Sequence, residues 1–367
     1  MRELQPRIIM LVDLDYFYAQ IEERRNPSIR DKPVVVCVYS GRTEDSGVVS
    51  TANYIARRYG VRSGMPIVLA KKRLKDVESV FLPVDHDYYR EISDRIMMIL
   101  RGNADSFEQV GIDEAYLDVS QRTGGDFEKA AALAQLVKSE VRVQEGLTCS
   151  IGVGPNKVVA KIAADIRKPD GLTIVRPEEV KGFLSKLPVN RLIGVGKKTA
   201  ERLEGLGVRT IGDLAGYDLQ RLIECFGNSL GAYLHNASNG IDDEPVQERG
   251  EAESISRIAT LKEDTLDLGV TTQTTDRLCQ EVHERLVQRG LSFKSVGIVA
   301  VMKDLSIRTR SKTFEGPTDD LEVLRGTVKE LFEKFLAESK VEARRVGVRI
   351  SGLVKEKEAQ KRLTRFF

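Results

Sequence analysis

The sequence has no run of about 18 apolar residues, the length that a membrane-spanning helix needs. Its first residues, MRELQPRIIMLVDLDYF, place acidic residues where the apolar core of a signal peptide would have to continue. We therefore expect a cytoplasmic protein that has no membrane partner.

Cysteine and histidine are scarce as well, with 4 and 3 residues among 367. The cysteines lie far apart, without a CxxC pair or a nearby cluster of histidines, at Cys37, Cys149, Cys225 and Cys279. Zinc sites and disulfide frameworks both require closer, paired spacings. The sequence indicates neither, and we expect reduced, mostly buried thiols.

An excess of charge of one sign is also lacking, because 57 Lys and Arg residues nearly balance 55 Asp and Glu residues. A net charge of +2 does not by itself indicate a nucleic-acid partner. Basic residues do gather in short runs, and each run taken alone is typical of a solvated surface. The runs are Arg57, Arg58 and Arg62; Lys71, Lys72, Arg73 and Lys75; Arg308, Arg310 and Lys312; and Arg344, Arg345 and Arg349.

The composition is that of a globular protein, with 41% hydrophobic and 31% charged residues, and the length favours roughly two to four compact units. Up to about residue 174, apolar strands and amphipathic helices predict an α+β sheet with helices on one face. Short helices with Gly-rich turns follow over 175–240, then a polar linker over 241–252. Beyond it, the order strand, helix, strand, strand, helix, strand predicts a compact unit of four strands and two helices over 253–352.

Acidic residues follow two of the apolar segments. Residues 7–12, RIIMLV, predict a buried strand that ends at Asp13 and Asp15, and Asp113 and Glu114 follow a second apolar segment. Carboxylate and phosphate oxygens are the ligands that Mg²⁺ prefers, so two converging acidic strand ends favour phosphoryl or nucleotidyl transfer. The alternative is that each acid caps a turn or pairs with a nearby arginine. Since neighbouring side chains on an ideal strand face opposite sides, Asp113 and Glu114 can share a metal only near a hairpin end or a distortion.

Four segments carry a resemblance to a known family: VDLDYFYAQIE, STANYIARRYGVRSGMP, GIDEAYLDVS and SIGVGPNKVVAKIAADIRKPDGL. In this order and spacing they resemble archaeal DinB-type Y-family DNA polymerases, the translesion enzymes, and the similarity runs from residue 7 to residue 367. The resemblance implies an α+β multidomain, right-hand polymerase fold with a palm, small fingers, a helical thumb and a C-terminal little finger. The implied bounds are 1–18 and 87–174 for the palm, 19–86 for the fingers, 175–240 for the thumb, 241–252 for the linker, 253–352 for the little finger and 353–367 for the tail.

The resemblance also implies the activity of a DNA-directed DNA polymerase. Such an enzyme adds dNMP to the 3′-hydroxyl of primed template DNA, with low fidelity, lesion bypass and no proofreading. By resemblance, two Mg²⁺ ions per active site are held by Asp13, Asp113, the backbone carbonyl of Leu14 and Glu114. Asp15 also fits the motif, but we expect it to have a structural, hydrogen-bonding role.

By the same resemblance, the residues expected at the incoming dNTP are Phe17, Tyr18, Thr51, Tyr54, Arg57 and Lys168. Tyr18 occupies the position of the family's steric gate, an aromatic ring that leaves no room for a ribose 2′-hydroxyl, and Phe17 lines the same pocket through its backbone. Thr51, Tyr54 and Arg57 lie three residues apart, which predicts one side of a single helix. Lys168 matches a phosphate-binding lysine of the family. Without the motif, Tyr18 is more simply a core residue and Arg57 a partner in a surface ion pair.

The segment LIGVGKKTAERLEGLGVRTIGDL predicts a helix-hairpin-helix. In this motif Gly194, Gly196 and Lys197 bind a DNA phosphate through backbone N–H groups and an ammonium charge. The alternative is that the glycines only cap helices.

In the last unit, Arg308, Arg310 and Lys312 alternate with uncharged residues and predict one basic sheet face that tracks a duplex backbone. The two predicted helices of that unit, over 270–290 and 319–339, carry most of its acids. We expect these helices to face away from the basic stripe.

The tail QKRLTRFF, residues 360–367, resembles a peptide that binds a sliding clamp of the PCNA type. The residues that match the pattern Qxx(I/L/M)xx(F/Y)(F/Y) are Gln360, Leu363, Phe366 and Phe367. The alternative is that the C-terminus docks on its own domain. We expect a monomer whose partners are primed template DNA, dNTP and the clamp.

Two other functions stay open at this point. One is an inactive DNA-binding or clamp-recruited scaffold of the same fold, which would not need the complete acidic set. The other is a palm-fold nucleotide cyclase, which would not need the hairpin, the basic sheet face or the tail. The sequence therefore favours the polymerase.

Overall fold

The computed structural model describes residues 6–248, 250 and 253–355. The chain forms two units. The first consists of residues up to 38, 49–65 and 69–249, and the second of 39–48, 66–68 and the residues from 250 onward. Within the described residues, every helix is too short or too polar to cross a membrane.

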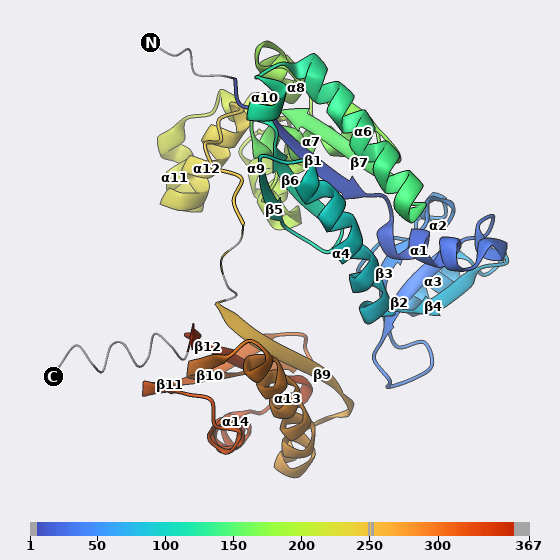
Figure 1. The fold of residues 1–367 in the computed structure, drawn as a ribbon. Helices are drawn as coiled ribbons and strands as arrows, with labels where there is room; N and C mark the ends of the chain where they lie inside the picture. The colour runs from blue at the N-terminus through green and yellow to red at the C-terminus, as the bar shows by residue number, and fades with distance from the viewer. Residues whose placement is uncertain (1–5, 249, 251–252, 356–367) are drawn as a thin grey trace. The chain divides into compact units, whose positions relative to one another are not determined.

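The centre of the first unit is a five-stranded sheet (Figure 1). In sheet order its strands are β5 Ser106–Gln109, β6 Glu114–Asp118, β1 Ile9–Leu14, β7 Cys149–Gly154 and β8 Leu172–Ile174. β1 runs antiparallel to both of its neighbours, whereas β7 and β8 are parallel. The buried strand predicted from RIIMLV is thus the central strand of the sheet.

Helices cover both faces of this sheet. They are α4 His86–Gly102, α6 Phe127–Glu145 with the short α5 Ser120–Thr123 before it, and α7 Lys157–Ile166. α4 and α6 share a buried cluster with Met10 and Val12 of β1, whereas α7 packs on the opposite face with Ile9 and Leu11. The expectation that helices lie on one face only is therefore wrong.

Glycines of β7 bring α7 close to the sheet. A Cβ atom at Gly152 would overlap the backbone oxygen of Ala160 and the backbone nitrogen of Ala164. Small residues on both sides of the contact thus allow the helix backbone to lie directly on the strand. This close approach fixes the position of α7 relative to the acidic end of β1.

Residues 17–83 form a second, smaller sheet with helices around it. The sheet has the order β3-β2-β4, with β2 and β4 parallel. Its elements are α1 Phe17–Arg25, the 3-10 helix η1 Pro27–Ile29, β2 Val34–Tyr39, β3 Gly47–Ala52, α2 Tyr54–Arg58, α3 Ile67–Arg73 and β4 Val80–Pro83.

Short helices follow β8 and share an apolar core with residues of α7. They are η2 Pro177–Glu179, α8 Val180–Ser185, η3 Val189–Arg191, α9 Lys197–Gly205, α10 Ile211–Ala215, α11 Leu219–Phe226 and α12 Asn228–Ser238. This region corresponds to the helical thumb expected from the sequence.

The segment predicted as a linker packs against the first unit over part of its length. Its described residues, 241–248 and 250, form no helix or strand. Val246 is buried in one cluster with Ile9 and Tyr116, and the backbone N–H of Val158 donates to the Asp242 carboxylate at 3.2 Å. Polar composition predicts the lack of regular structure but not this packing.

Within the second unit, residues 254–355 form an antiparallel sheet with two helices and their own core. Its elements are β9 Ser254–Thr265, α13 Leu268–Gln288, β10 Leu291–Met302, β11 Ile307–Thr318, α14 Leu321–Glu338, β12 Ala343–Ser351 and the two-residue β13 Val354–Lys355. The main strands have the order β11-β10-β12-β9. The predicted unit of four strands and two helices is confirmed.

Candidate active site

Asp13, Asp113 and Glu114 converge at one end of the central sheet. Asp13 lies in β1 directly opposite Glu114, the first residue of β6. Asp113 immediately precedes β6, and its carbonyl accepts a hydrogen bond from the Leu14 N–H at 2.8 Å. The pair Asp113 and Glu114 therefore lies at a hairpin end, which is the position that sharing one metal requires.

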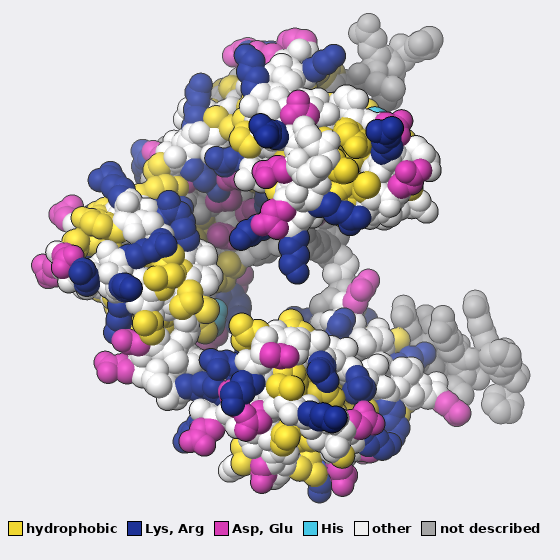
Figure 2. Space-filling model, turned by 180° about the vertical axis from the view of Figure 1, so that it is seen from behind, with side chains coloured by type: hydrophobic (Ala, Val, Ile, Leu, Met, Phe, Trp, Pro, Cys, Tyr) yellow, Lys and Arg dark blue, Asp and Glu magenta, His cyan; other side chains and the backbone are white. Residues whose placement is uncertain are grey.

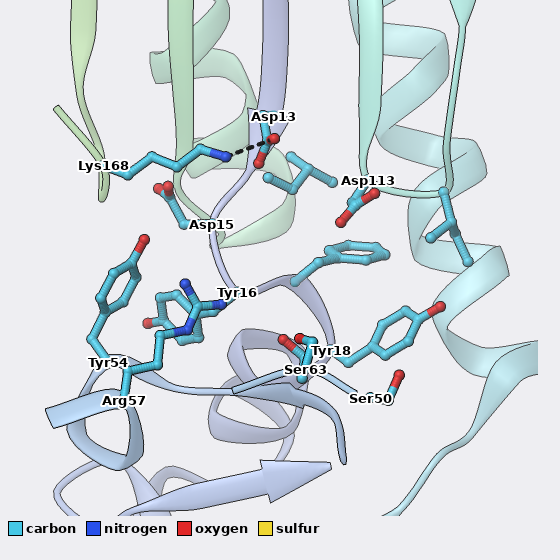
Figure 3. A pocket seen from close by; sticks show the side chains of 14 residues that line it. Asp13, Asp15, Tyr16, Tyr18, Ser50, Tyr54, Arg57, Ser63, Asp113 and Lys168 are labelled. Atoms are coloured by element: carbon cyan, nitrogen blue, oxygen red, sulfur yellow. Dashed lines mark ion pairs between the residues drawn. The ribbon is translucent and has the colours of Figure 1, made fainter. Parts of the chain in front are cut away.

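A cavity of about 410 Å³ opens beside Asp13 (Figure 3). It is lined by every residue expected at the metals or the nucleotide except Glu114: Asp13, Leu14, Phe17, Tyr18, Thr51, Tyr54, Arg57, Asp113 and Lys168. The remaining lining residues are Asp15, Tyr16, Ser50, Ser63 and Ile112. In Figure 3 Asp13 and Asp113 face the cavity from the end of the sheet and Lys168 faces it from the loop before β8. Tyr54 and Arg57 face it from α2.

Burial disfavours the ionised carboxylates of the cavity. It raises the pKa of Asp13 to about 6, against the opposing effect of Lys168, whose Nζ lies 2.7 Å from Asp13 Oδ2. Burial, and then the charge of Glu114, also raises the pKa of Asp113. A cation bound between these groups would stabilise both ionised forms.

The donor atoms fit a hard metal cation. Carboxylates of Asp13 and Asp113 and the backbone of Leu14 border one cavity, and such oxygen ligands suit Mg²⁺ rather than a soft metal. Among the described residues, no group of three His, Cys, Asp or Glu side chains is already arranged around a metal position. Two lysines hold the acids instead, since Lys168 pairs with Asp13 and Lys161 binds both oxygens of Glu114 at 2.7 Å.

Thr51, Tyr54 and Arg57 do not share one helix, so that prediction from their spacing is wrong. Thr51 lies in β3, and α2 begins only at Tyr54. The reason is Asn53, whose side chain caps the helix by accepting a hydrogen bond from the Ala56 N–H at 2.9 Å. The three predicted residues still line the same cavity.

Tyr16 and Asn53, which no sequence pattern singled out, fix this wall of the cavity. Tyr16 has a left-handed backbone, with φ 35°, and its ring meets that of Tyr54 edge-on at 5.3 Å between centroids. The Tyr16 hydroxyl donates to Glu23 at 3.1 Å, and the Asn53 amide donates to the same carboxylate at 2.7 Å. Glu23 thereby joins α1 to the start of α2. An Asn just before YIARR is the available sequence signal, because Asn is a preferred N-cap.

Asp15 holds the loop that carries Lys168. Its buried carboxylate accepts hydrogen bonds from the hydroxyls of Thr148 at 2.8 Å and Ser150 at 2.7 Å, and from the Asp170 N–H at 2.8 Å. These contacts tie the loop to β7. They match the structural role that the sequence predicts for Asp15.

Comparisons with known proteins agree with this geometry. Family models match residues 12–165 as the impB/mucB/samB family, 190–242 as the thumb domain of DNA polymerase-iota, and 252–363 as the impB/mucB/samB family C-terminal domain. DNA polymerase IV of Nitrosopumilus maritimus (strain SCM1) is 48% identical over 365 residues, which cover 99% of this chain and 100% of the relative. The chain belongs to the DinB-type Y family of DNA polymerases. It is a DNA-directed DNA polymerase of the translesion type, and the family resemblance is confirmed.

A more distant relative and two solved structures support the same family. DNA polymerase IV of Saccharolobus solfataricus (strain ATCC 35092 / DSM 1617 / JCM 11322 / P2) is 40% identical over 347 residues, covering 95% of this chain and 97% of the relative. A chimera of the Y-family polymerases Dbh and Dpo4 has a TM-score of 0.90 at 35% identity and covers 95% of this chain and 100% of its own. An insertion ternary complex of Dbh has a TM-score of 0.69 at 35% identity with the same coverage. The α+β right-hand polymerase fold is confirmed, and this family consists of metal-dependent nucleotidyltransferases.

In the thumb of this Y-family polymerase, a turn joins the 3-10 helix η3 to α9. Gly194 has a positive φ of 80°, and Gly196 is the N-cap of α9 without a capping side chain. Lys197 begins the helix, and its side chain is 90% exposed. The hydroxyl of Tyr233 donates to the Ile193 carbonyl at 2.8 Å and fixes the turn. Exposed backbone and a lysine at a helix start suit a phosphate group.

The basic stripe of β11 lies on the helix-bearing side of the second unit. Each residue of the stripe is paired with a residue of β10 that is buried beneath the helices. The paired residues of the stripe are Arg308, Arg310 and Lys312. Lys312 lies 2.8 Å from Glu330 and Arg310 lies 3.6 Å from Glu338, both on α14. The expectation that the acidic helices face away from this stripe is therefore wrong for α14.

The opposite face of that sheet carries other arginines. Arg345 and Arg349 of β12 are exposed and alternate with buried valines, so they point away from the helices. Gly347 lies between the two arginines in β12, and Gly297 of the neighbouring strand β10 pairs with Arg349. Small residues thus keep this face flat around two arginines. Figure 2 shows that Lys and Arg side chains are numerous on this unit, at the bottom of the view.

Proposed function

We propose that this polymerase extends primed template DNA with low fidelity, bypasses lesions, lacks proofreading and uses two Mg²⁺ ions per active site. The observation that carries the proposal is the cavity in which Asp13 and Asp113 share the lining with Arg57 and Lys168. Carboxylates suit metal ions, and the two basic side chains suit a triphosphate. One cavity therefore contains the groups that both parts of a nucleotidyl transfer need.

Asp13, Asp113 and the carbonyl of Leu14 are the ligands that we assign to the metal ions. Glu114 would join them if its carboxylate exchanged its contact with Lys161 for a metal ion. Bound ions supply activation of the primer hydroxyl and neutralise charge on the triphosphate. Burial raises the pKa of both aspartates, and a cation bound to them would favour their ionised forms.

Thr51, Tyr54, Arg57 and Lys168 are the residues that we assign to the triphosphate. The guanidinium of Arg57 lies 4.8 Å from the centre of the Tyr54 ring, and its Nε donates to the Ala52 carbonyl at 2.9 Å, so the group is oriented before a nucleotide binds. Lys168 contacts Asp13 in this structure. With the Asp13 carboxylate bound to a cation, the Lys168 ammonium would be available to a phosphate oxygen.

Tyr18 is the residue that we assign to sugar selection. Its half-buried ring borders the cavity next to Asp113, and Phe17 lies beside it with its own side chain buried in the core. In this arrangement the tyrosine ring faces the sugar, and Phe17 contributes its backbone. A ribose 2′-hydroxyl is then excluded by contact with the Tyr18 ring.

DNA and dNTP are the partners that this function requires, and a similar solved structure is an insertion ternary complex of Dbh DNA polymerase. We assign contacts with the sugar-phosphate backbone of DNA to Gly194, Gly196 and Lys197 in the thumb. In the little finger we assign them to the basic residues of both sheet faces: Arg308, Arg310, Lys312, Arg345 and Arg349. Such contacts give affinity that falls with salt and depends little on sequence.

The clamp-binding residues Gln360, Leu363, Phe366 and Phe367 lie outside the described residues. Their complete match to a clamp-peptide pattern supports binding of a PCNA-type clamp. We propose a monomer that the clamp recruits to the primer end.

Primer extension with dNTP and Mg²⁺ tests the proposal. Wild-type protein should extend a primed template, and Asp113→Asn should lower the rate by more than about 100-fold, because residues that merely support metal ligands already account for about 10- to 100-fold. Asp118→Asn is a matched control at the far end of β6, where the carboxylate accepts a hydrogen bond from the Ser120 N–H. Equal extension by wild type and Asp113→Asn would contradict the site, and no extension by either would favour the inactive scaffold.

A further inference from the structure

The ring of Tyr18 stacks on the ring of Tyr89 in the palm. The two centroids are 4.4 Å apart and the ring planes differ by 21°. Tyr89 belongs to α4 and is completely buried, whereas Tyr18 is partly buried and borders the active-site cavity. Tyr89 thus supports the Tyr18 ring from the core side.

Tyr89 is itself held in one orientation. Its hydroxyl donates to a carboxylate oxygen of Glu22 at 2.7 Å, and the Glu22 residue is only 8% exposed. Burial, followed by the contact with Glu22, raises the pKa of Tyr89, so the phenol remains the donor of this hydrogen bond. Glu22 lies on α1, the helix that also carries Tyr18. The hydrogen bond therefore ties the supporting ring to the element that positions the gate.

Other aromatic neighbours leave Tyr89 as the main support of the Tyr18 ring. The Phe17 ring is tilted by 44° relative to the Tyr18 ring, with 5.7 Å between the centroids. The His86 ring meets the Tyr18 ring edge-on, with 6.4 Å between the centroids. Only Tyr89, among the described aromatic neighbours, makes a near-parallel contact with the gate ring. A parallel contact resists rotation of the ring out of its plane, since rotation separates the two faces.

We propose that Tyr89 is a positioning residue for sugar selection, which holds the Tyr18 ring where it excludes a ribose 2′-hydroxyl. This inference rests on the gate role proposed for Tyr18. Without the stacked ring, Tyr18 gains rotational freedom and can yield to the additional hydroxyl. Discrimination against ribonucleotides then falls although the gate residue is intact.

The test compares kcat/KM for a dNTP and the matching rNTP in full-length Tyr89→Leu and Tyr89→Met, two variants that fill the space without an aromatic face. We expect the ratio of dNTP to rNTP efficiency to fall by roughly 3- to 10-fold, the effect of losing one aromatic contact. Most of the change should be a lower KM for the rNTP. Tyr89→Phe, which keeps the stacked ring, should restore most of the selectivity.

Tyr88→Leu is the matched control. Tyr88 is the adjacent residue of α4, but its hydroxyl accepts a hydrogen bond from Arg24 and its ring lies under Arg25, away from Tyr18. We expect this variant to keep the wild-type ratio. A purely structural effect of position 89 would lower the efficiency with both nucleotides together and leave the ratio unchanged.

A double variant separates the inference from the proposed gate. Tyr18→Ala should abolish most of the discrimination, and adding Tyr89→Leu to it should change the ratio no further, because Tyr89 acts through Tyr18. If Tyr18→Ala lowers the ratio but both folded Tyr89 variants keep it, the role of Tyr89 is refuted while the gate stands. If Tyr18→Ala itself leaves the ratio unchanged, the gate assignment and the role of Tyr89 both fail.

Discussion

Lys161 of α7 donates a hydrogen bond to each carboxylate oxygen of Glu114, at 2.7 Å in both cases. The two side chains are 29% and 20% exposed, so the contact is partly shielded from water. Among the residues expected at the metals or the nucleotide, Glu114 is the one that does not line the cavity of Asp13 and Asp113. In this structure the Lys161 ammonium therefore contacts Glu114 where a metal ion would otherwise bind the carboxylate.

Removal of this lysine should lower the metal requirement of the polymerase. In Lys161→Met, Glu114 no longer has to exchange an ammonium for a metal ion, and we expect the Mg²⁺ concentration at half-maximal primer extension to fall by roughly 2- to 10-fold. Mn²⁺ binding measured by electron paramagnetic resonance should show the same direction without catalysis. Lys129→Met, on the exposed side of α6, is the control. A higher metal requirement in Lys161→Met would show that the lysine supports Glu114 rather than competing for it.

Gly152→Ala should severely destabilise the first unit. The added Cβ would overlap backbone atoms of Ala160 and Ala164, which cannot move without displacing α7 from β7. We expect a loss of more than about 3 kcal/mol in the free energy of unfolding, measured by chemical denaturation. Gly182→Ala is the opposite control, because nothing lies within 4 Å of its Cβ position in α8. A gain of about 0.5 to 1 kcal/mol is expected there, and similar effects of both substitutions would disprove the close contact.

The two basic faces of the little finger should differ in DNA binding. Arg349 is exposed on the face without helices, whereas Lys312 already pairs with Glu330 at 2.8 Å. We expect Arg349→Ala to reduce the slope of log Kd against log salt by about 1, because one phosphate contact is lost. Lys312→Ala should change the slope less. The reverse order, measured by fluorescence anisotropy with a primed duplex, would assign the DNA to the helix-bearing side.

Deletion of residues 360–367 should abolish stimulation by the clamp. The Leu363 and Phe366–Phe367 side chains are the apolar anchors of the predicted peptide, and without them the clamp has no groove ligand. Primer extension without a clamp should keep its rate. Equal stimulation of the full-length and truncated enzymes would refute the clamp peptide.

Local patterns predicted the elements, and long-range contacts decided how those elements meet. The run RIIMLV predicts β1, and the element order after residue 252 predicts a unit of four strands and two helices. By contrast, the position of α7 on the second face depends on contacts between Gly152 and residues of a different element. No periodicity within either segment contains that information.

The same distinction applies to the active site. Motifs predicted most of the residues that line the cavity, because the order of their segments is specific. Spacing alone placed Thr51 on a helix that in fact begins after the Asn53 cap. Pairing of Glu114 with Lys161, and of Tyr18 with Tyr89, joins residues far apart in the sequence. The alternation of charged and uncharged residues correctly placed the basic residues of β11 on one face of the sheet. Which face the helices cover depends on how all the strands and helices pack, and the sequence of β11 alone does not contain that information.

The raised pKa of Asp13 predicts that the free energy of unfolding depends on pH in the absence of metal. Burial raises its pKa from 3.8 to about 6, so the folded protein binds the proton more tightly than the unfolded chain does. Stability therefore falls as pH rises between these two values, and the full cost of ionising Asp13 is present above about pH 6.

Asp13→Asn should remove this cost. At about 1.4 kcal/mol for each pKa unit, we expect a gain of up to about 3 kcal/mol at pH 8. The gain should vanish as the pH falls toward 3.8, the value for the unfolded carboxyl, because wild-type Asp13 is then protonated in both states. Urea denaturation between pH 4 and pH 8 in the presence of a chelator measures the difference. Asp165→Asn, which removes the other carboxylate that contacts Lys168 at 2.7 Å, is the control. Because Asp165 is exposed, its substitution should give no comparable gain, and a pH-independent effect of Asp13→Asn would show that burial does not raise the pKa of Asp13.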